Sequence, residues 1–197
     1  SLIMATVKDI RGTQTEKNVL SAYLAESSAY TRYTFYARQA EKENYFPIAR
    51  IFNDTAANEF NHSKVFFKML QGGNITIPVN ADSGVIADTA SNLATAAHEE
   101  VAEAADVYMA SADMARKEGF DEIADHFEAI AKVERFHNER FMRYLKMVKD
   151  GTVWKRDQPI KWRCLVCGFV YEGTEPPQAC PGCDHPYQHY MALEDYC

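Results

Sequence analysis

Glutamates in the middle of four apolar helix faces constrain this chain more than any other feature. Apolar residues recur at helical spacing over four long segments, and each inward-facing row is interrupted near its centre by Glu26, Glu59, Glu100 or Glu134. Glutamate is rarely buried, and an unpaired buried carboxylate costs several kcal/mol. A bundle that packs these rows together must therefore neutralise the carboxylates with protons or cations.

Start and stop signals set the limits of the four helices. Thr13-Gln14-Thr15-Glu16 fits a capping box, Pro47 suits a first helical turn, and glycines follow the later segments. The stretch from Asn74 to Asp88 is long enough to cross a bundle. We therefore expect a mainly α fold, a ferritin-like four-helix bundle with one long crossover, with helices over about 13–43, 47–72, 88–119 and 121–151.

An internal repeat links the two halves of the bundle. Glu59-x-x-His62 and Glu134-x-x-His137 each place a carboxylate and an imidazole one turn apart on a single helix face. A further glutamate precedes each pair, Glu26 by 33 residues and Glu100 by 34. One Glu from two helices and Glu-x-x-His from the other two is the ligand pattern of di-iron and di-manganese bundles. The sequence therefore predicts a dinuclear metal site.

Other residues are assigned from their place on the helix faces. Glu103, one turn further along the third helix, is a fifth candidate carboxylate, and Tyr33 and Tyr108 are expected in the core or hydrogen-bonded to a ligand glutamate. Tyr30 and Val107 are expected to point inward. Several residues off the rows are expected on solvated faces: Glu99, Glu122, Glu128, Glu139, His98 and His126.

All five cysteines lie near the end of the chain. Cys164-x-x-Cys167 and Cys180-x-x-Cys183 can bring four thiolates to one tetrahedral metal, which on these residues alone is either zinc or iron. Two considerations favour iron. The carboxylate site in the bundle implies redox chemistry, and an electron relay would give the cysteine segment a purpose. Cys197 has no partner at ligand spacing and is expected to be a free thiol.

The same segment differs from the rest in composition. Short strands are expected around Trp162, Val166 and Phe169–Tyr171, separated by Gly and Pro. The segment 161–197 is too short to bury the apolar surface that unaided folding needs, and a bound metal would supply the missing stability. We therefore divide the chain into a bundle over 1–153, a linker over 154–160 and a small β/loop metal domain over 161–197.

Composition excludes several classes of function. The chain has a formal net charge of −7, which makes it a poor nucleic-acid binder. It has no apolar run of the roughly 18 residues that a membrane span needs and no apolar leader, so a cytoplasmic protein is expected. No G-x-G-x-x-G motif is present, so a separate reductase must supply any electrons.

At these motifs the chain resembles the rubrerythrin family over nearly its whole length. The resemblance rests on these stretches: Glu26, Thr31-Arg-Tyr-Thr-Phe-Tyr-Ala37, Glu59-Phe-Asn-His62, Glu100-Val-Ala-Glu103, Glu118-Gly-Phe120, Glu134-Arg-Phe-His137 and the rubredoxin-like Trp162-Arg-Cys164, Cys167-Gly168 and Cys180-Pro-Gly-Cys183. Ferritins lack the four-cysteine tail, and free rubredoxins lack the bundle.

The resemblance implies two metal sites. One is a non-haem di-iron centre in which Glu59 and Glu134 bridge, His62 is an alternate ligand, and one iron moves between the positions of Glu103 and His62 on redox change. Its ligands, which are also the implied catalytic residues, are Glu26, Glu59, Glu100, Glu103, Glu134 and His137. The other is a mononuclear iron on Cys164, Cys167, Cys180 and Cys183. Zinc or manganese could replace iron.

The implied activity is reduction of hydrogen peroxide to water in oxidative-stress defence. Electrons would come from a rubredoxin or an NAD(P)H-dependent reductase through the four-cysteine iron. The resemblance also implies a homodimer in which this domain serves the partner's di-iron site. Two alternatives stay open: a ferroxidase or iron-handling protein, and a binding module with a zinc ribbon and the bundle as scaffold.

Overall fold

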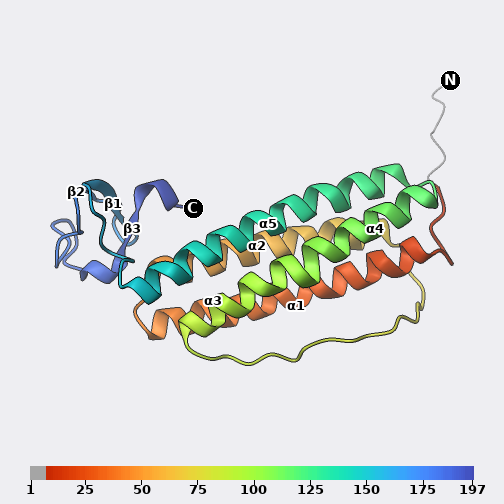
Figure 1. Ribbon diagram of the computed structural model, residues 1–197, viewed down its shortest axis with the longest axis horizontal. Helices are drawn as coiled ribbons and strands as arrows, with labels where there is room; N and C mark the ends of the chain where they lie inside the picture. The colour runs from red at the N-terminus through yellow and green to blue at the C-terminus, as the bar shows by residue number, and fades with distance from the viewer. Residues whose placement is uncertain (1–7) are drawn as a thin grey trace, which may run out of the picture.

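The computed structural model describes residues 8–197 as a long helical bundle with a small sheet at one end (Figure 1). The first hairpin consists of α1 (Gln14–Lys42) and α2 (Phe46–Met69). Three consecutive helical elements form the third long segment of the bundle, called the third rod: α3 (Thr89–His98), the π-helix η1 (Glu99–Ala105) and α4 (Asp106–Lys117). It pairs with α5 (Asp121–Asp150). The predicted bundle of two hairpins joined by one crossover is confirmed.

The predicted helix starts and stops have clear causes. The Thr13 hydroxyl accepts a hydrogen bond from the backbone N–H of Glu16, and the Glu16 carboxylate accepts one from the N–H of Gly12. The first contact satisfies a donor that the first helical turn leaves open, and the second ties the residue before the cap to the same turn. Gly151 ends α5 in the left-handed conformation, at φ 68°, which glycine adopts without strain.

The crossover between α2 and α3 runs the length of the bundle along α1 and the third rod (Figure 1). It is fixed where it joins α3, because Asp88 caps that helix through the N–H of Ser91 and Glu43 accepts a hydrogen bond from the N–H of Thr89. The Tyr36 hydroxyl donates to the carbonyl of Val85. The end of the crossover that joins α3 is therefore tied to α1.

The carboxylate layer divides the apolar core into two clusters. One cluster, which includes Tyr33, Phe52 and Phe141, lies toward the sheet. The other, which includes Phe66 and Phe127, lies toward the turn between α4 and α5. In each rod the predicted ligand positions fall between the residues of the two clusters. The site therefore occupies the middle of the bundle.

The π-helix was not predicted, and it changes which residues face inward. A π-turn contains an extra residue, so the positions that follow it are rotated relative to a continuous α-helix. Val107, which we expected inside, is 49% exposed, and Tyr108 is buried. The prediction for Tyr30 was also wrong: it is 40% exposed and packs against the ring of Phe60 on the outer face of the hairpin.

The C-terminal segment folds as a three-stranded antiparallel sheet of β1 (Ile160–Cys164), β2 (Val170–Gly173) and β3 (Tyr190–Ala192), in the order β2-β1-β3. Short 3-10 turns, η2 (Tyr187–His189) and η3 (Leu193–Asp195), flank β3. Val166 and Phe169 lie in the turn between β1 and β2, so their assignment to strands was wrong.

The sheet packs on the end of its own bundle. The His189 ring stacks on Phe46 at 3.8 Å between centroids, and Met191 joins the nearer core cluster. Asp195 accepts a hydrogen bond from the Tyr144 hydroxyl on α5. These contacts fix the four-cysteine domain beside the start of α2 and the end of α5.

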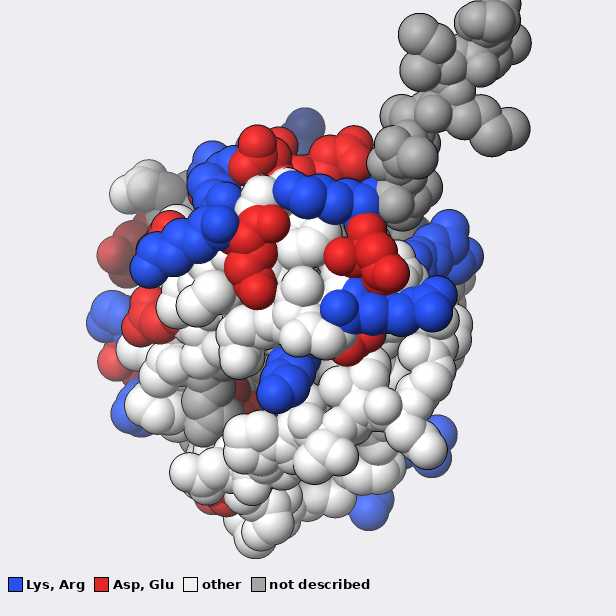
Figure 2. Space-filling view, turned by 90° about the vertical axis from the view of Figure 1, so that its right-hand side faces the viewer, with Lys and Arg blue, Asp and Glu red and all other residues white. Residues whose placement is uncertain are grey.

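The end of the bundle remote from the sheet carries charges of both signs (Figure 2). Figure 2 shows the end of the bundle remote from the sheet, where charges of both signs gather in the upper part and the lower part is largely uncharged. No concentrated field of one sign is present on that face to attract nucleic acid. Within residues 8–197, no helix combines the length and apolar character of a membrane span.

Candidate metal centres

The predicted ligands of the bundle come together in two groups. Within each group the ligand atoms lie within 4.8 Å of one another. Glu59 on α2 and Glu134 on α5 belong to both groups, and so they lie where ligands shared by two cations would lie. The first group is Glu26, Glu59, His62 and Glu134, and the second is Glu59, Glu100, Glu134 and His137. The seventh predicted ligand, Glu103, lies in η1, but its side chain is outside the described part of the structure.

Each imidazole faces the two shared carboxylates. His62 Nδ1 lies 3.3 Å from Oε1 of Glu134 and 3.9 Å from Oε2 of Glu59. His137 Nδ1 lies 3.0 Å from Oε1 of Glu59 and 3.3 Å from Oε2 of Glu134. The same nitrogen of both histidines thus points at the centre of the cluster.

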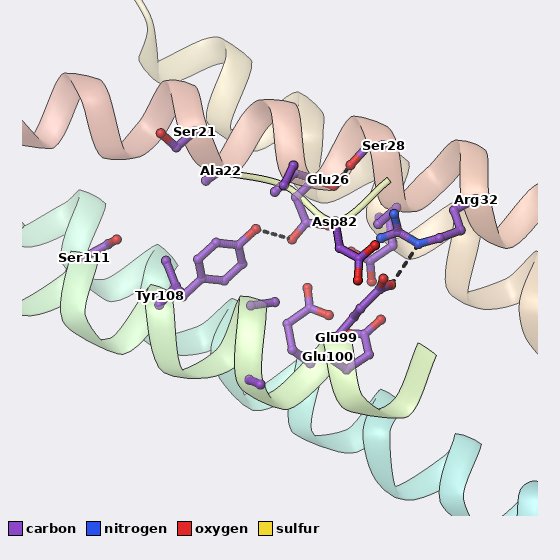
Figure 3. Close-up of a pocket in the computed structure, with 18 of the residues that line it drawn as sticks. Ser21, Ala22, Glu26, Ser28, Arg32, Asp82, Glu99, Glu100, Tyr108 and Ser111 are labelled. Carbon is purple, nitrogen blue, oxygen red and sulfur yellow. Dashed lines mark hydrogen bonds and ion pairs between the residues drawn. The ribbon is translucent and has the colours of Figure 1, made fainter. Parts of the chain in front are cut away.

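Two tyrosines join the first and third rods through reciprocal hydrogen bonds. Tyr33 on α1 donates to Oε1 of Glu100 at 2.7 Å. Tyr108 on α4 donates to Oε1 of Glu26 at 2.9 Å (Figure 3). Tyr33 follows Glu26 by seven residues and Tyr108 follows Glu100 by eight. The difference matches the extra residue of the π-helix between Glu100 and Tyr108. Burial and the nearby carboxylates raise the pKa of both tyrosines, so both remain donors.

The donor set fits cations. Glu26 and Glu100 are 1% and 2% exposed, and Oε2 of each accepts no hydrogen bond from any residue that the structure describes. A buried carboxylate oxygen without a donor is costly unless a cation binds it. Carboxylate oxygens and imidazole nitrogens are the ligands that iron and manganese accept in such bundles. These residues therefore fit a pair of divalent cations.

The pKa values of the cluster report the same excess of negative charge. Burial by itself lowers the pKa of His62, but the carboxylates of Glu134 and Glu59 outweigh burial and raise it to about 9. The pKa of His137 is raised in the same way, by Glu100, Glu134 and Glu59 against the effect of burial. Burial, together with Glu100, raises the pKa of Glu134. Protons and cations would thus compete for the same atoms.

Asn58 is a functional candidate that sequence reasoning missed. Its amide Oδ1 lies 2.9 Å from Nε2 of His137. Because a carbonyl oxygen only accepts, the proton of the ring is placed on Nε2, and the lone pair available to a metal is that of Nδ1. No spacing rule marks an asparagine one residue before a ligand, so the sequence held no signal for this contact.

Glu99 corrects a sequence prediction. We expected it on a solvated face, but it is 8% exposed, and its Oε2 lies 2.8 Å from Nε of Arg32 on α1 (Figure 3). Glu99 and Glu100, the first residues of η1, both face α1. Arg32–Glu99 and Tyr33–Glu100 therefore form two adjacent links between α1 and η1. His98 and His126 are exposed.

A cavity of about 690 Å³ connects the cluster with the surface. It lies between α1 and the third rod, and residues Asn80–Asp82 of the crossover form part of its wall (Figure 3). Its floor includes the candidate ligands Glu26, Glu59, Glu100 and Glu134. A small molecule can therefore reach the carboxylates from this side.

The four predicted cysteines form the second centre. Their Sγ atoms lie within 4.8 Å of one another, with 3.7 Å between Cys164 and Cys183 and 3.6 Å between Cys167 and Cys180. A Cβ on Gly182 would stand 3.1 Å from the Cys167 sulfur, so a side chain at this position would crowd the sulfurs. Four convergent thiols fit a tetrahedral iron or zinc ion. Cys197 is not part of the group.

The fold and the two centres define the class of this protein. It is a ferritin-like bundle that holds a buried carboxylate–histidine cluster and carries a four-cysteine sheet domain. The family model described as rubrerythrin matches residues 17–145, and the model of the rubrerythrin rubredoxin-like domain matches residues 162–191. The chain belongs to the rubrerythrin family.

Individual relatives agree. The chain is 43% identical to rubrerythrin from Nitratidesulfovibrio vulgaris, over 95% of this chain and 98% of that protein. It is 44% identical to rubrerythrin from Porphyromonas gingivalis, over 95% of this chain and 94% of that protein. Among solved structures, fully reduced, all-ferrous nigerythrin matches with a TM-score of 0.61 and 26% identity, over 98% of this chain and 91% of that one.

Proposed function

We propose that this protein is a non-haem di-iron peroxide reductase that reduces hydrogen peroxide to water. The observation that carries the proposal is the pair of ligand groups that share Glu59 and Glu134 at the floor of a cavity open to solvent. Glu59 and Glu134 would be shared by two cations, and such a pair would supply Lewis acidity to one O–O bond. The reaction consumes one peroxide, two electrons and two protons and releases two waters.

The proposed cofactors are two iron ions in the bundle and one on the cysteines. Their protein ligands would be Glu26, Glu59, Glu100, Glu103, Glu134 and His137, with His62 as an alternate ligand, and Cys164, Cys167, Cys180 and Cys183. A related structure is named as all-ferrous nigerythrin, which supports iron in this fold. A ferrous pair would supply two electrons and the Lewis acidity that polarises peroxide.

The surrounding residues would position the ligands and admit protons. Tyr33 and Tyr108 each hold one oxygen of Glu100 and Glu26, which would fix these two carboxylates beside the cluster. Asn58 orients the ring of His137. Because the cavity is open to solvent, protons can reach the reacting oxygens through its water and the carboxylates on its floor.

The four-cysteine domain would relay electrons one at a time from an external donor, a rubredoxin or an NAD(P)H-dependent reductase. Phe46, on which this domain packs, precedes Glu59 by 13 residues of α2, or about 20 Å at ~1.5 Å per residue. That separation within one chain supports a homodimer in which each four-cysteine domain serves the partner's cluster. We place this activity in the cytoplasm, in defence against oxidative stress.

An anaerobic titration tests the proposal. The reduced full-length protein, with three irons per chain by metal analysis, is mixed with hydrogen peroxide while the visible spectra of both centres are followed. We expect stoichiometric oxidation of both and fast recovery when an electron donor is added. A ferroxidase would instead oxidise added ferrous ions and retain them, and the four-cysteine centre would remain unchanged. A zinc-ribbon binding module would show zinc on the cysteines and no turnover.

A further inference from the structure

The cavity beside the carboxylate cluster is larger than hydrogen peroxide needs. Peroxide has two oxygen atoms and requires about the space of two waters, roughly 60 Å³ at ~30 Å³ each. The cavity has a volume of about 690 Å³, which lies within the ~300–1,000 Å³ typical of sites for larger organic ligands. The surplus space is open at one side and reaches the candidate ligands at the other.

Small apolar side chains line this space from both sides. Ala22, Ala25 and Ala29 contribute from α1, and Ala102 and Ala104 from the third rod. At the floor, Glu26 and Glu100 are almost fully buried, and Oε2 of each lacks a hydrogen-bond donor among the described residues. Polar residues such as Ser21 and Ser28 also line the cavity, but the alanines form an apolar part of its wall beside the carboxylate end. That combination suits a molecule with one apolar and one peroxidic end.

The rim limits the charge of what can enter. Arg32, Glu99 and Asp82 lie toward one end, with the Arg32 guanidinium already paired to Glu99, and Ser21 and Ser111 lie toward the other (Figure 3). The Asp82 carboxylate places a negative charge at the rim, and it disfavours anionic ligands such as fatty-acid hydroperoxides. Neutral molecules meet no such barrier.

From these observations we propose that the cavity is a substrate chamber that admits neutral short-chain alkyl hydroperoxides as well as hydrogen peroxide. The proposal rests on the peroxide reductase function and adds a substrate class to it. In the reaction the O–O bond of ROOH breaks. The hydroperoxide is reduced by two electrons from the external one-electron donor, and two protons from solvent complete one alcohol, ROH, and one water.

The test compares two substrates on the same preparation of iron-loaded, full-length protein. We expect wild-type kcat/KM for tert-butyl hydroperoxide to lie within about tenfold of that for hydrogen peroxide. Ala25→Phe, which adds a ring to the wall, should lower the value for tert-butyl hydroperoxide by about tenfold or more and that for hydrogen peroxide by less than about twofold. Ala129→Phe, at an exposed alanine on α5 outside the chamber, is the matched control and should change neither.

A structural readout is independent of turnover. Crystals of the wild-type protein soaked in tert-butyl alcohol, the product, should show it against Ala22 and Ala25, and crystals of Ala25→Phe should not. Wild-type protein that reduces hydrogen peroxide but not tert-butyl hydroperoxide would overturn the inference and leave the proposed function intact. So would equal losses for both substrates in Ala25→Phe. Protein that reduces neither substrate would overturn the proposed function itself.

Discussion

The amide oxygen of Asn58 lies 2.9 Å from Nε2 of His137 and fixes which nitrogen of that ring faces the carboxylate cluster. We expect Asn58→Ala to weaken metal binding by about 10- to 100-fold, because the imidazole loses its orientation and its preferred tautomer. Asn58→Asp, which retains an acceptor, should restore most of the affinity. The measurement is iron or zinc binding in competition with a chelator.

Asn61 on the same helix provides the control for Asn58. It is exposed, and its side chain donates to the carbonyl of Ala57. Asn61→Ala should bind metal as the wild type does. Equal affinities for Asn58→Ala and the wild type would show that this contact does not position the histidine.

Glu134 belongs to both ligand groups, and so its removal should disrupt both metal positions. Glu134→Ala should lose at least one of the two bundle metals and the rapid oxidation by hydrogen peroxide, since each cation would lose one of its two shared ligands. Metal analysis and stopped-flow absorbance measure the two losses. Glu139→Ala removes an exposed glutamate from the same helix and should change neither. Wild-type oxidation kinetics in Glu134→Ala would refute the assignment.

The metal-free protein should lose stability as pH rises through the range in which His62 titrates. Its pKa is raised from 6.5 to about 9 in the folded protein, so the stabilisation is complete below pH 6.5 and disappears by about pH 9. At ~1.4 kcal/mol per pH unit, such a shift contributes on the order of 3 kcal/mol. Urea unfolding of the metal-free protein across this range measures the effect.

Metal should suppress that pH dependence, because a bound cation takes over the charge balance that the proton provides in its absence. His62→Gln should reduce the dependence in the metal-free protein, whereas His98→Gln, at an exposed histidine, should leave it unchanged. A stability that is flat between pH 6.5 and 9 in metal-free wild type would contradict the charge excess derived for the cluster.

Cys183→Ser should separate single turnover from cycling. The variant loses one of four thiolates that lie within 4.8 Å of each other, so the relay metal binds weakly or is redox-inactive. A protein reduced chemically beforehand should still consume one equivalent of peroxide, but steady-state turnover with the donor should fall to background. Cys197→Ser is the control, because Cys197 lies outside the group. Sustained cycling by Cys183→Ser would exclude the relay role.

Much of this arrangement follows from sequence because its signals are local. A glutamate in an apolar row, an imidazole one turn away and two Cys-x-x-Cys pairs each fix a geometry within one element. The positions of Glu26 and Glu100 at a common depth follow because both hairpins repeat the same spacing.

The features that were missed depend on packing between elements. The π-helix rotates the positions that follow it and exposes Val107, whereas Glu99 is buried by its contact with Arg32 on α1. Nothing in the residues 99–105 distinguishes a π-turn from an α-turn. The prediction for Tyr30 was wrong for a related reason. Helical periodicity gives the direction of a side chain around the axis of its helix, whereas the width of the buried face is set by how closely α2 approaches α1.

The split of the apolar core by a charged layer has a mechanical consequence. The cluster around Phe52 and the cluster around Phe127 meet across like-charged carboxylates, which repel one another unless something positive lies between them. Bound cations would thus hold the two halves of the bundle together at its middle. The rigidity of the whole bundle would then depend on its metal content, and a molecule without iron would loosen first at its centre.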